Sequence, residues 1–196
     1  MPLWGAVEGT ETLPKWLSTA QQKDVFANQS GWVVEAGSAM TGNGNTGADP
    51  EILVAIGNLA GLSGTTGLGE ATINTVDWNI TAWSRAAGGT LSVTVRYNET
   101  VTVAVSNPTL IVTNDSRSDH TLTYSGGTGT HELTFTLAIA AANAAIHATD
   151  VLSVAAQSVV LASSSTIKDT STTPQNAELV ISAGQGTACG TITAVA

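Results

Sequence analysis

The stretch LSVTVRYNETVTV, at residues 91–103, decides the fold class of this chain. From Leu91 to Tyr97, and again from Val101 to Val103, every second residue is apolar and its neighbours are serine, threonine or arginine. Alternation with a period of two places the apolar side chains on one face of an extended strand. The dipeptide Asn98-Glu99 interrupts the alternation and is typical of a turn. We therefore predict half-buried β-strands on both sides of this turn.

The same alternation recurs through the chain after residue 50. Apolar residues two positions apart occur in Ile52–Ile56, Leu110–Val112, Leu122–Tyr124, Leu133–Ile139, Leu152–Val154, Val159–Leu161 and Leu179–Ile181. Clusters of glycine, asparagine and proline, such as Gly126–Gly129, separate these runs and favour hairpin turns. A helical candidate between them, Ala138–Ala148, is too short and too rich in alanine to cover a sheet. With roughly nine strands, the natural arrangement is an all-β antiparallel sandwich.

The residues from Met1 to Val34 lack this alternation and are rich in aromatic side chains. They include Trp4, Trp16, Phe26 and Trp32 on a background of polar and small residues. Buried aromatic side chains dominate the energetics of many interfaces, and this segment is too short to bury them by itself. We therefore predict an extended N-terminal arm whose aromatic residues Trp4, Trp16, Phe26 and Trp32 anchor it on another chain.

A change in composition marks the end of this arm. Gly37–Pro50, with the sequence GSAMTGNGNTGADP, has the chemistry of a flexible linker. We therefore assign residues 1–50 to the arm and linker and residues 51–196 to the sandwich. Within the arm, Ser18–Ala27 is a helix candidate with Ser18 as its N-cap.

The charge composition excludes several partners. Only 11% of the 196 residues are charged, whereas a typical soluble domain has roughly 25%. The formal net charge is −9 and the six lysines and arginines are scattered, so no basic patch is available for nucleic acid. No apolar run approaches the roughly 18 residues that cross a bilayer, and no secretory signal is visible. We predict neither a nucleic-acid partner nor a membrane partner.

The candidate chemical groups form no catalytic or metal motif. His120, His131 and His147 have no metal-ligand spacing such as HxH or HExxH, so we interpret them as surface or strand-end residues. No GxSxG element frames a nucleophilic serine. Asp115 and Asp119 share the loop NDSRSD, but two carboxylates are too few for calcium without further oxygen ligands. We predict no enzyme activity and no cofactor, and leave open whether calcium binds near Asp115 and Asp119.

Four pieces of the chain recur in a fixed order in a known family: LSVTVRYNETVTV at 91–103, NPTLIVTN at 107–114, TLTYSGGTGTHELTFTLAI at 121–139 and SSTIKDT at 164–170. Together they resemble the bacterial immunoglobulin-like repeats of large adhesins and cell-surface proteins. This resemblance covers about half of the chain and implies that the sandwich is an immunoglobulin-like antiparallel β-sandwich.

The chain ends carry a second resemblance. The strings MPLWG, LPKW and FANQSGWV near the N-terminus, and AELVISAGQGTACGTITAVA at 177–196, resemble small virion structural proteins of tailed phages, especially marine cyanophages. A building block present in many copies gains from anchoring arms, from a surface poor in charge and from an acidic balance that avoids packaged DNA. The resemblance implies that the chain is located in the virion.

Together these observations predict a virion structural protein, most directly a capsid decoration or cement subunit anchored by its N-terminal arm. Its expected partners are the major capsid protein or another virion protein, and further copies of itself in a homo-oligomer. Two alternatives stay open. The chain is a neck or tail component in the first, and an adhesin-like module that binds a host surface glycan in the second.

Overall fold

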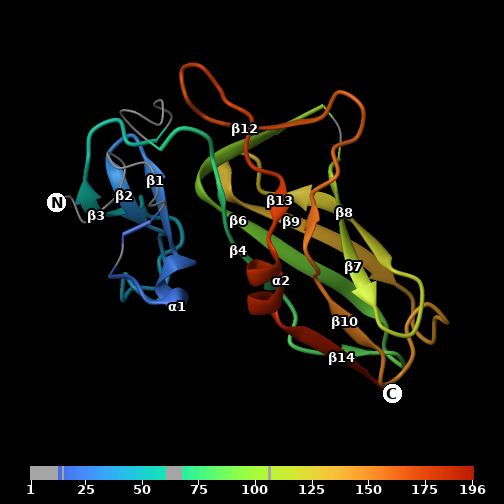
Figure 1. Ribbon diagram of the computed structural model, residues 1–196. Helices are drawn as coiled ribbons and strands as arrows, with labels where there is room; N and C mark the ends of the chain where they lie inside the picture. Colours follow the sequence, from blue (N-terminus) through green and yellow to red (C-terminus); the bar gives the residue numbers. More distant parts are fainter. Residues whose placement is uncertain (1–12, 15, 61–67, 106) are drawn as a thin grey trace.

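The computed structural model of the chain describes residues 13–14, 16–60, 68–105 and 107–196 (Figure 1). Strands dominate these residues, which confirms the all-β class. The helices are α1 (Thr19–Gln22) and α2 (Ala183–Cys189). The strands are β1 (Val25–Asn28), β2 (Gly31–Val34), β3 (Glu51–Ala55), β4 (Ile73–Trp78), β5 (Trp83–Ser84), β6 (Gly89–Ala104), β7 (Thr109–Asn114), β8 (His120–Gly126), β9 (Thr130–Ile139), β10 (Val151–Ser153), β11 (Gln157–Ser158), β12 (Thr166–Asp169), β13 (Val180–Ile181) and β14 (Thr191–Val195).

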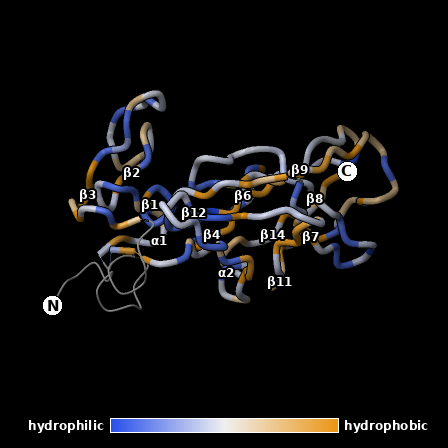
Figure 2. The backbone as a smooth tube through the Cα atoms, turned by 90° about the horizontal axis from the view of Figure 1, so that it is seen from above, coloured by the Kyte–Doolittle hydropathy of each residue, from blue (hydrophilic) through white to orange (hydrophobic). Residues whose placement is uncertain are grey.

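Two separate hydrophobic clusters divide the described residues into two units. The smaller cluster is built from residues 13–60, with Leu68 packed against it. The larger cluster begins at Ala71 and ends at Ala194. We call residues 13–60 the N-terminal unit and residues 71–196 the main unit. Figures 1 and 2 show the units side by side, with the C-terminus at the far end of the main unit.

The N-terminal unit is a small antiparallel sheet, so the prediction of an extended arm is wrong for its described residues. β1 and β2 form a hairpin, and β3 pairs with the other side of β2. Trp32 of β2 is 0% exposed and lies in one cluster with Leu59. The segment 37–50, predicted to be a linker, therefore leads the chain back to the β1–β2 hairpin. Trp32 is thus buried within its own chain.

This pairing also moves the domain boundary. We predict the boundary at residue 50, but β3 (Glu51–Ala55) pairs with β2 and not with a strand of the main unit. The division between the two hydrophobic clusters lies after Ala60 instead. Of the helix predicted over Ser18–Ala27, the start is confirmed, because the Ser18 hydroxyl accepts a hydrogen bond from the backbone N–H of Gln21 and caps α1. The rest is wrong, because α1 ends at Gln22 and Val25–Ala27 belong to strand β1.

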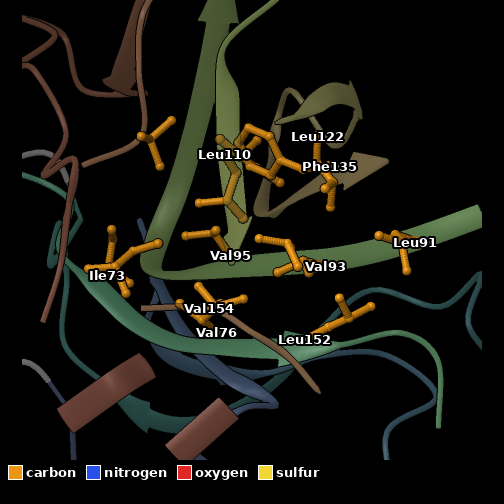
Figure 3. Close-up of a cluster of buried hydrophobic side chains, with 14 of the residues drawn as sticks. Ile73, Val76, Leu91, Val93, Val95, Leu110, Leu122, Phe135, Leu152 and Val154 are labelled. Carbon is orange, nitrogen blue, oxygen red and sulfur yellow. The ribbon is translucent and has the colours of Figure 1, made fainter. Parts of the chain in front are cut away.

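The main unit is a mixed sheet that folds around one core. Its hydrogen-bonded order is β4-β6-β9-β8-β7-β10-β14-β5. β5 and β14 are parallel, as is the contact between β1 and β6, so the sheet is not purely antiparallel as predicted. Val76 of β4 and Leu152 of β10 come from strands far apart in this order, yet both line the same hydrophobic cluster (Figure 3). The sheet must therefore curve back on itself.

The predicted inward-facing residues of this core are largely confirmed. β9 spans Thr130–Ile139, the segment expected to be a strand, and alternates buried and partly buried positions. Val93, Val95, Leu133 and Phe135 are all 0% exposed, whereas Leu137 is only partly buried. Figure 3 shows Val93, Val95 and Phe135 pointing into a common interior.

β6 contains a wide irregularity where the sequence predicts a turn. Its pairing with β9 jumps from Arg96 opposite Glu132 to Val101 opposite Thr130, so the four residues 97–100 lie opposite the single residue His131. Asn98 and Glu99 are each 1% exposed. The predicted turn is therefore wrong, because these polar residues form a buried β-bulge within one long strand. The bulge also contacts the N-terminal unit through the pairing of Ala27 in β1 with Glu99.

The long connection between β10 and β14 adds further pairing. β12 pairs with the end of β6 beyond the bulge, and β11 pairs with β13. α2 packs against β4, where the Gln185 side chain donates a hydrogen bond of 2.6 Å to the carbonyl of Ile73. Among the described residues, neither helix has the length and apolar character that a membrane crossing requires.

Candidate functional site

The two units meet at a pocket beside the bulge of β6. It has a volume of about 420 Å³, and its lining includes Phe26, Glu35, Thr46, Pro50, Thr130 and His131. We call it the junction pocket. β1 and the segment that follows β2 supply one wall, and the beginning of β9 supplies the other. The pocket therefore exists only because the hairpin of the N-terminal unit packs on the main unit.

His131 is the central group of the junction pocket. It is 3% exposed, and its ring stacks on Phe26 with centroids 4.2 Å apart and planes inclined by 10°. The ring donates a hydrogen bond to the backbone carbonyl of Lys23. Nε2 has no hydrogen-bond partner, so the donor to Lys23 is Nδ1. The imidazole is thus held in the tautomer that leaves the lone pair of Nε2 available.

The electrostatics keep this imidazole neutral. Burial, and secondarily the nearby Arg96 guanidinium, lower the pKa of His131 to about 4. The closest carboxylate is that of Glu35, whose Oε2 lies 4.0 Å from His131 Nε2. Burial raises the pKa of Glu35, and the neighbouring carboxylate of Glu132 raises it further. A histidine with so low a pKa is a poor general base at neutral pH but a good ligand.

An ion-pair network orients the charged groups around the pocket. Arg96 Nε donates to Glu132 Oε1 at 2.5 Å, and its NH1 group lies 2.8 Å from Asp77 Oδ2. Lys23 of the N-terminal unit forms a second ion pair with Asp77. The Glu35, His131 and Glu132 side chains each offer a ligand atom, and these atoms lie within 4.8 Å of one another. Among the described residues, they form the group of three ligating side chains closest to a metal-binding arrangement.

The predicted anchor residues have different surroundings. Trp4 lies outside the described residues. Trp16 is 49% exposed. Phe26 is 8% exposed against His131, and Trp32 is 0% exposed within the N-terminal cluster. In this structure Phe26 and Trp32 are covered by their own chain, because the hairpin and the segment up to Ala60 enclose them.

A second polar group of residues lies where the β7–β8 and β9–β10 connections meet. We call Asn114, Arg117, His120, His147 and Asp150 the loop-end cluster. Arg117 lies 3.3 Å from Asp150 Oδ2 and 2.7 Å from His147 Nδ1. Asn114 donates to Asp150 Oδ2 at 3.1 Å. The backbone N–H of His147 lowers the pKa of Asp150, and burial lowers the pKa of His120.

This cluster borders a pocket of about 410 Å³. The pocket is lined by Ser116, Arg117, Ser118, Asp119, His120, Ala144 and Ala145. His120 and His131 lie at the beginnings of β8 and β9, so their interpretation as strand-end residues is confirmed. They are not surface residues, because they are only 6% and 3% exposed.

The loop considered for calcium uses its carboxylates internally. Asp115 Oδ1 accepts hydrogen bonds from the backbone N–H of Val151 and the hydroxyl of Ser116. Asp119 Oδ1 accepts from the backbone N–H of Asn114. Both carboxylates therefore stabilise the connection between β7 and β8.

The sequence held a partial signal for the junction pocket. His131 continues the alternation of Leu133 and Phe135 toward the N-terminus, so it occupies an inward-facing position of β9. That periodicity could have indicated a buried histidine. Glu35 carried no such signal, because it approaches His131 only through the packing of two units far apart in sequence.

No protein-family model matches the chain, and neither a curated protein nor a solved structure is significantly similar to it.

Proposed function

We propose that this chain is a structural protein of a virus particle, most directly a capsid decoration or cement subunit. The N-terminal unit attaches to the major capsid protein or another virion protein, and the main unit projects from the surface. The main unit has no catalytic role in this proposal. The arrangement of two units with separate cores supports such a division of labour, because each can present its own surface.

The single observation that carries this proposal is the open edge of β3. β3 is the terminal strand of the hydrogen-bonded order, with β2 as its neighbour among the described strands. Ile52 on this strand is 58% exposed. An exposed edge with an apolar residue is a ready template for pairing with another chain, and natural proteins usually protect such edges. β3 therefore offers the attachment surface that the proposal requires.

The strand order supports an immunoglobulin-like main unit. An immunoglobulin sandwich places its first, second, fifth and fourth strands in one sheet and its third, sixth and seventh in the other. Here β4, β6, β9 and β8 are successive neighbours, as are β7, β10 and β14. If β4 counts as the first strand, and β5 as a short extra strand that pairs with β14, β4-β6-β9-β8 matches the first sheet of an immunoglobulin sandwich and β7-β10-β14 matches the second. A projecting sandwich of this kind needs no cofactor to fold.

The first experiment asks whether the chain belongs to the particle. Particles purified from the source of the sequence are analysed by quantitative mass spectrometry. The proposal expects this chain at a fixed ratio to the major shell protein that matches a symmetric set of sites. A chain absent from washed particles, or present only in trace amounts, contradicts the proposal.

A pair of variants then tests the attachment surface. Ile52→Lys places a charge on the exposed edge of β3, whereas Val160→Lys changes a residue of similar exposure, 53%, in the main unit. We expect Ile52→Lys to weaken binding to undecorated particles at least tenfold, since loss of a central apolar contact costs on the order of 2 kcal/mol. Val160→Lys is expected to bind like the original chain. Equal binding by both variants would exclude β3 as the attachment surface.

The pocket beside the loop-end cluster favours a second candidate function, an adhesin-like module for a host surface glycan. Arg117 and the serines of this pocket offer hydrogen-bond donors to sugar hydroxyls. Glycan-array binding that is lost in Arg117→Ala, but kept in Lys168→Ala on β12, would support it. If the original chain binds no glycan on the array, this second function is excluded and only the attachment role remains.

A further inference from the structure

The junction pocket contains a buried histidine nitrogen without a partner, facing carboxylates from both units. We propose that Glu35, His131 and Glu132 bind a divalent metal ion, preferentially zinc. The bound ion links the N-terminal unit to the main unit. The proposal concerns the purified chain and does not depend on its location in a virus particle.

His131 has the local geometry of a metal ligand. Its Nδ1 donates to the Lys23 carbonyl, and its Nε2 is buried, unpaired and 4.0 Å from Glu35 Oε2. Ligating histidines usually donate their other ring N–H to a carbonyl or carboxylate, which fixes the tautomer and the ring orientation. A buried polar atom without a partner is costly, so an occupant that accepts its lone pair is favoured.

The carboxylates are arranged to complete the site. Arg96 binds Oε1 of Glu132 and so orients that carboxylate, as an outer-shell residue does around a metal. Glu35 follows β2, and its side chain is 40% exposed and free to adjust. Ligand atoms about 2.0–2.2 Å from zinc are roughly 3.3–3.6 Å apart in a tetrahedron, so the three ligand atoms, which lie within 4.8 Å of one another, move closer together around the ion. Water supplies the fourth ligand.

The local charge balance also favours a cation. The acidic groups around the pocket outnumber the basic groups by two charges, with Asp24, Glu35, Asp77 and Glu132 against Lys23 and Arg96. A divalent ion compensates this excess. The imidazole selects among such ions, because calcium and magnesium prefer oxygen ligands only, whereas zinc readily accepts nitrogen.

Such an ion would act as a clamp between the units. Glu35 belongs to the N-terminal unit, whereas His131 and Glu132 belong to β9 of the main unit. An ion that binds the assembled pocket but not the separated units stabilises their packing by mass action. The orientation of the attachment surface on β3 would then depend on bound metal.

The test uses the full chain, freed of metal by a chelator, and zinc chloride as the titrant in calorimetry. We expect one zinc per chain and a thermal midpoint that rises with zinc concentration. Glu35→Gln should weaken zinc binding at least roughly tenfold, since even outer-shell changes cost 10–100-fold in affinity. Calcium and magnesium should bind far more weakly than zinc.

Two control variants test whether zinc binds at the junction pocket and not at another carboxylate or histidine of the chain. Glu51→Gln removes an exposed carboxylate of β3, and His147→Ala removes a histidine of the loop-end cluster. Both variants should keep the affinity of the original chain. Unchanged zinc binding in Glu35→Gln, or loss of binding in His147→Ala, would overturn the proposal. Because Glu35 is partly exposed, Glu35→Gln should fold normally, and its near-ultraviolet circular dichroism checks this directly.

Discussion

At the scale of single residues, His131 illustrates how burial decides the chemistry of a side chain. The ring lies between Phe26 and the beginning of β9, and Arg96 is close enough to oppose a positive charge on it. The neutral form is therefore strongly favoured in the folded chain. The same interactions are absent when the chain unfolds, so stability must depend on pH.

The first prediction is the direction of this dependence. The pKa of His131 is about 4 in the folded chain and near 6.5 when unfolded, so between these values the unfolded state binds the additional proton. Lowering the pH from 6.5 toward 4 should cost up to roughly 3 kcal/mol of unfolding free energy. Glu35 and Asp24, whose pKa values are raised, act in the opposite direction. Urea unfolding of the chelator-treated chain at several pH values measures the net change in unfolding free energy from all of these groups.

His131→Gln isolates the contribution of the histidine, because it keeps a polar group of similar size without a titration in this range. The difference in unfolding free energy between the original chain and this variant should shrink as the pH falls from 6.5 to 4. A constant difference across that window would mean that His131 is protonated in the folded chain.

A second prediction at this scale concerns Phe135. Its side chain is 0% exposed and meets Tyr124 edge-on, with ring centroids 6.1 Å apart. Phe135→Ala leaves a cavity in the main core and should lower the unfolding free energy by roughly 3–5 kcal/mol. Ile52→Ala, at an exposed position, should change it by less than about 0.5 kcal/mol. Similar effects of the two changes would contradict the assignment of Phe135 to a rigid core.

At the scale of elements, the sequence predicted strands better than their irregularities. The alternation of Leu133 and Phe135 specified β9 together with its buried face. Asn98 and Glu99 instead suggested a turn, because residue type alone does not reveal that a polar residue lies buried inside a bulge. In the folded chain the Asn98 side chain accepts a hydrogen bond of 2.8 Å from the backbone of Thr72, which lies far away in sequence. Only tertiary structure supplies that partner.

The hairpin between β8 and β9 provides the third prediction. Gly127 and Gly129 both have positive φ, at 109° and 83°, but a Cβ on Gly127 would collide with the carbonyl of Glu132, whereas one on Gly129 would meet open space. Gly129→Ala should cost about 1–2 kcal/mol through backbone conformation alone. Gly127→Ala should cost more than about 3 kcal/mol, since steric overlap adds to backbone strain. Thermal unfolding of both variants tests this, and equal midpoints would refute the close approach of β9 to Gly127.

At the scale of the whole molecule, composition and periodicity predicted an all-β chain with a distinct N-terminal part. They could not predict that this part folds as its own sheet, because β3 reads as one more alternating strand like those of the main unit. The aromatic residues were predicted to anchor an arm on another chain, whereas Phe26 and Trp32 pack within their own chain. The candidate site was missed for the same reason, since Glu35 and His131 meet only when the two units pack.

The division into two cores determines the last prediction, on which the attachment role depends. The main cluster contains no residue before Ala71, so deleting residues 1–60 should leave a folded main unit that no longer binds particles. Deleting only residues 1–34 is a different experiment. It removes β1 and β2 but leaves β3 without its partner strand and Leu59 without its cluster, so this shorter deletion should aggregate. Circular dichroism, size-exclusion chromatography and particle sedimentation distinguish the two products. Full decoration of particles by the chain lacking residues 1–60 would show that the attachment surface lies on the main unit, and it would remove β3 from the mechanism.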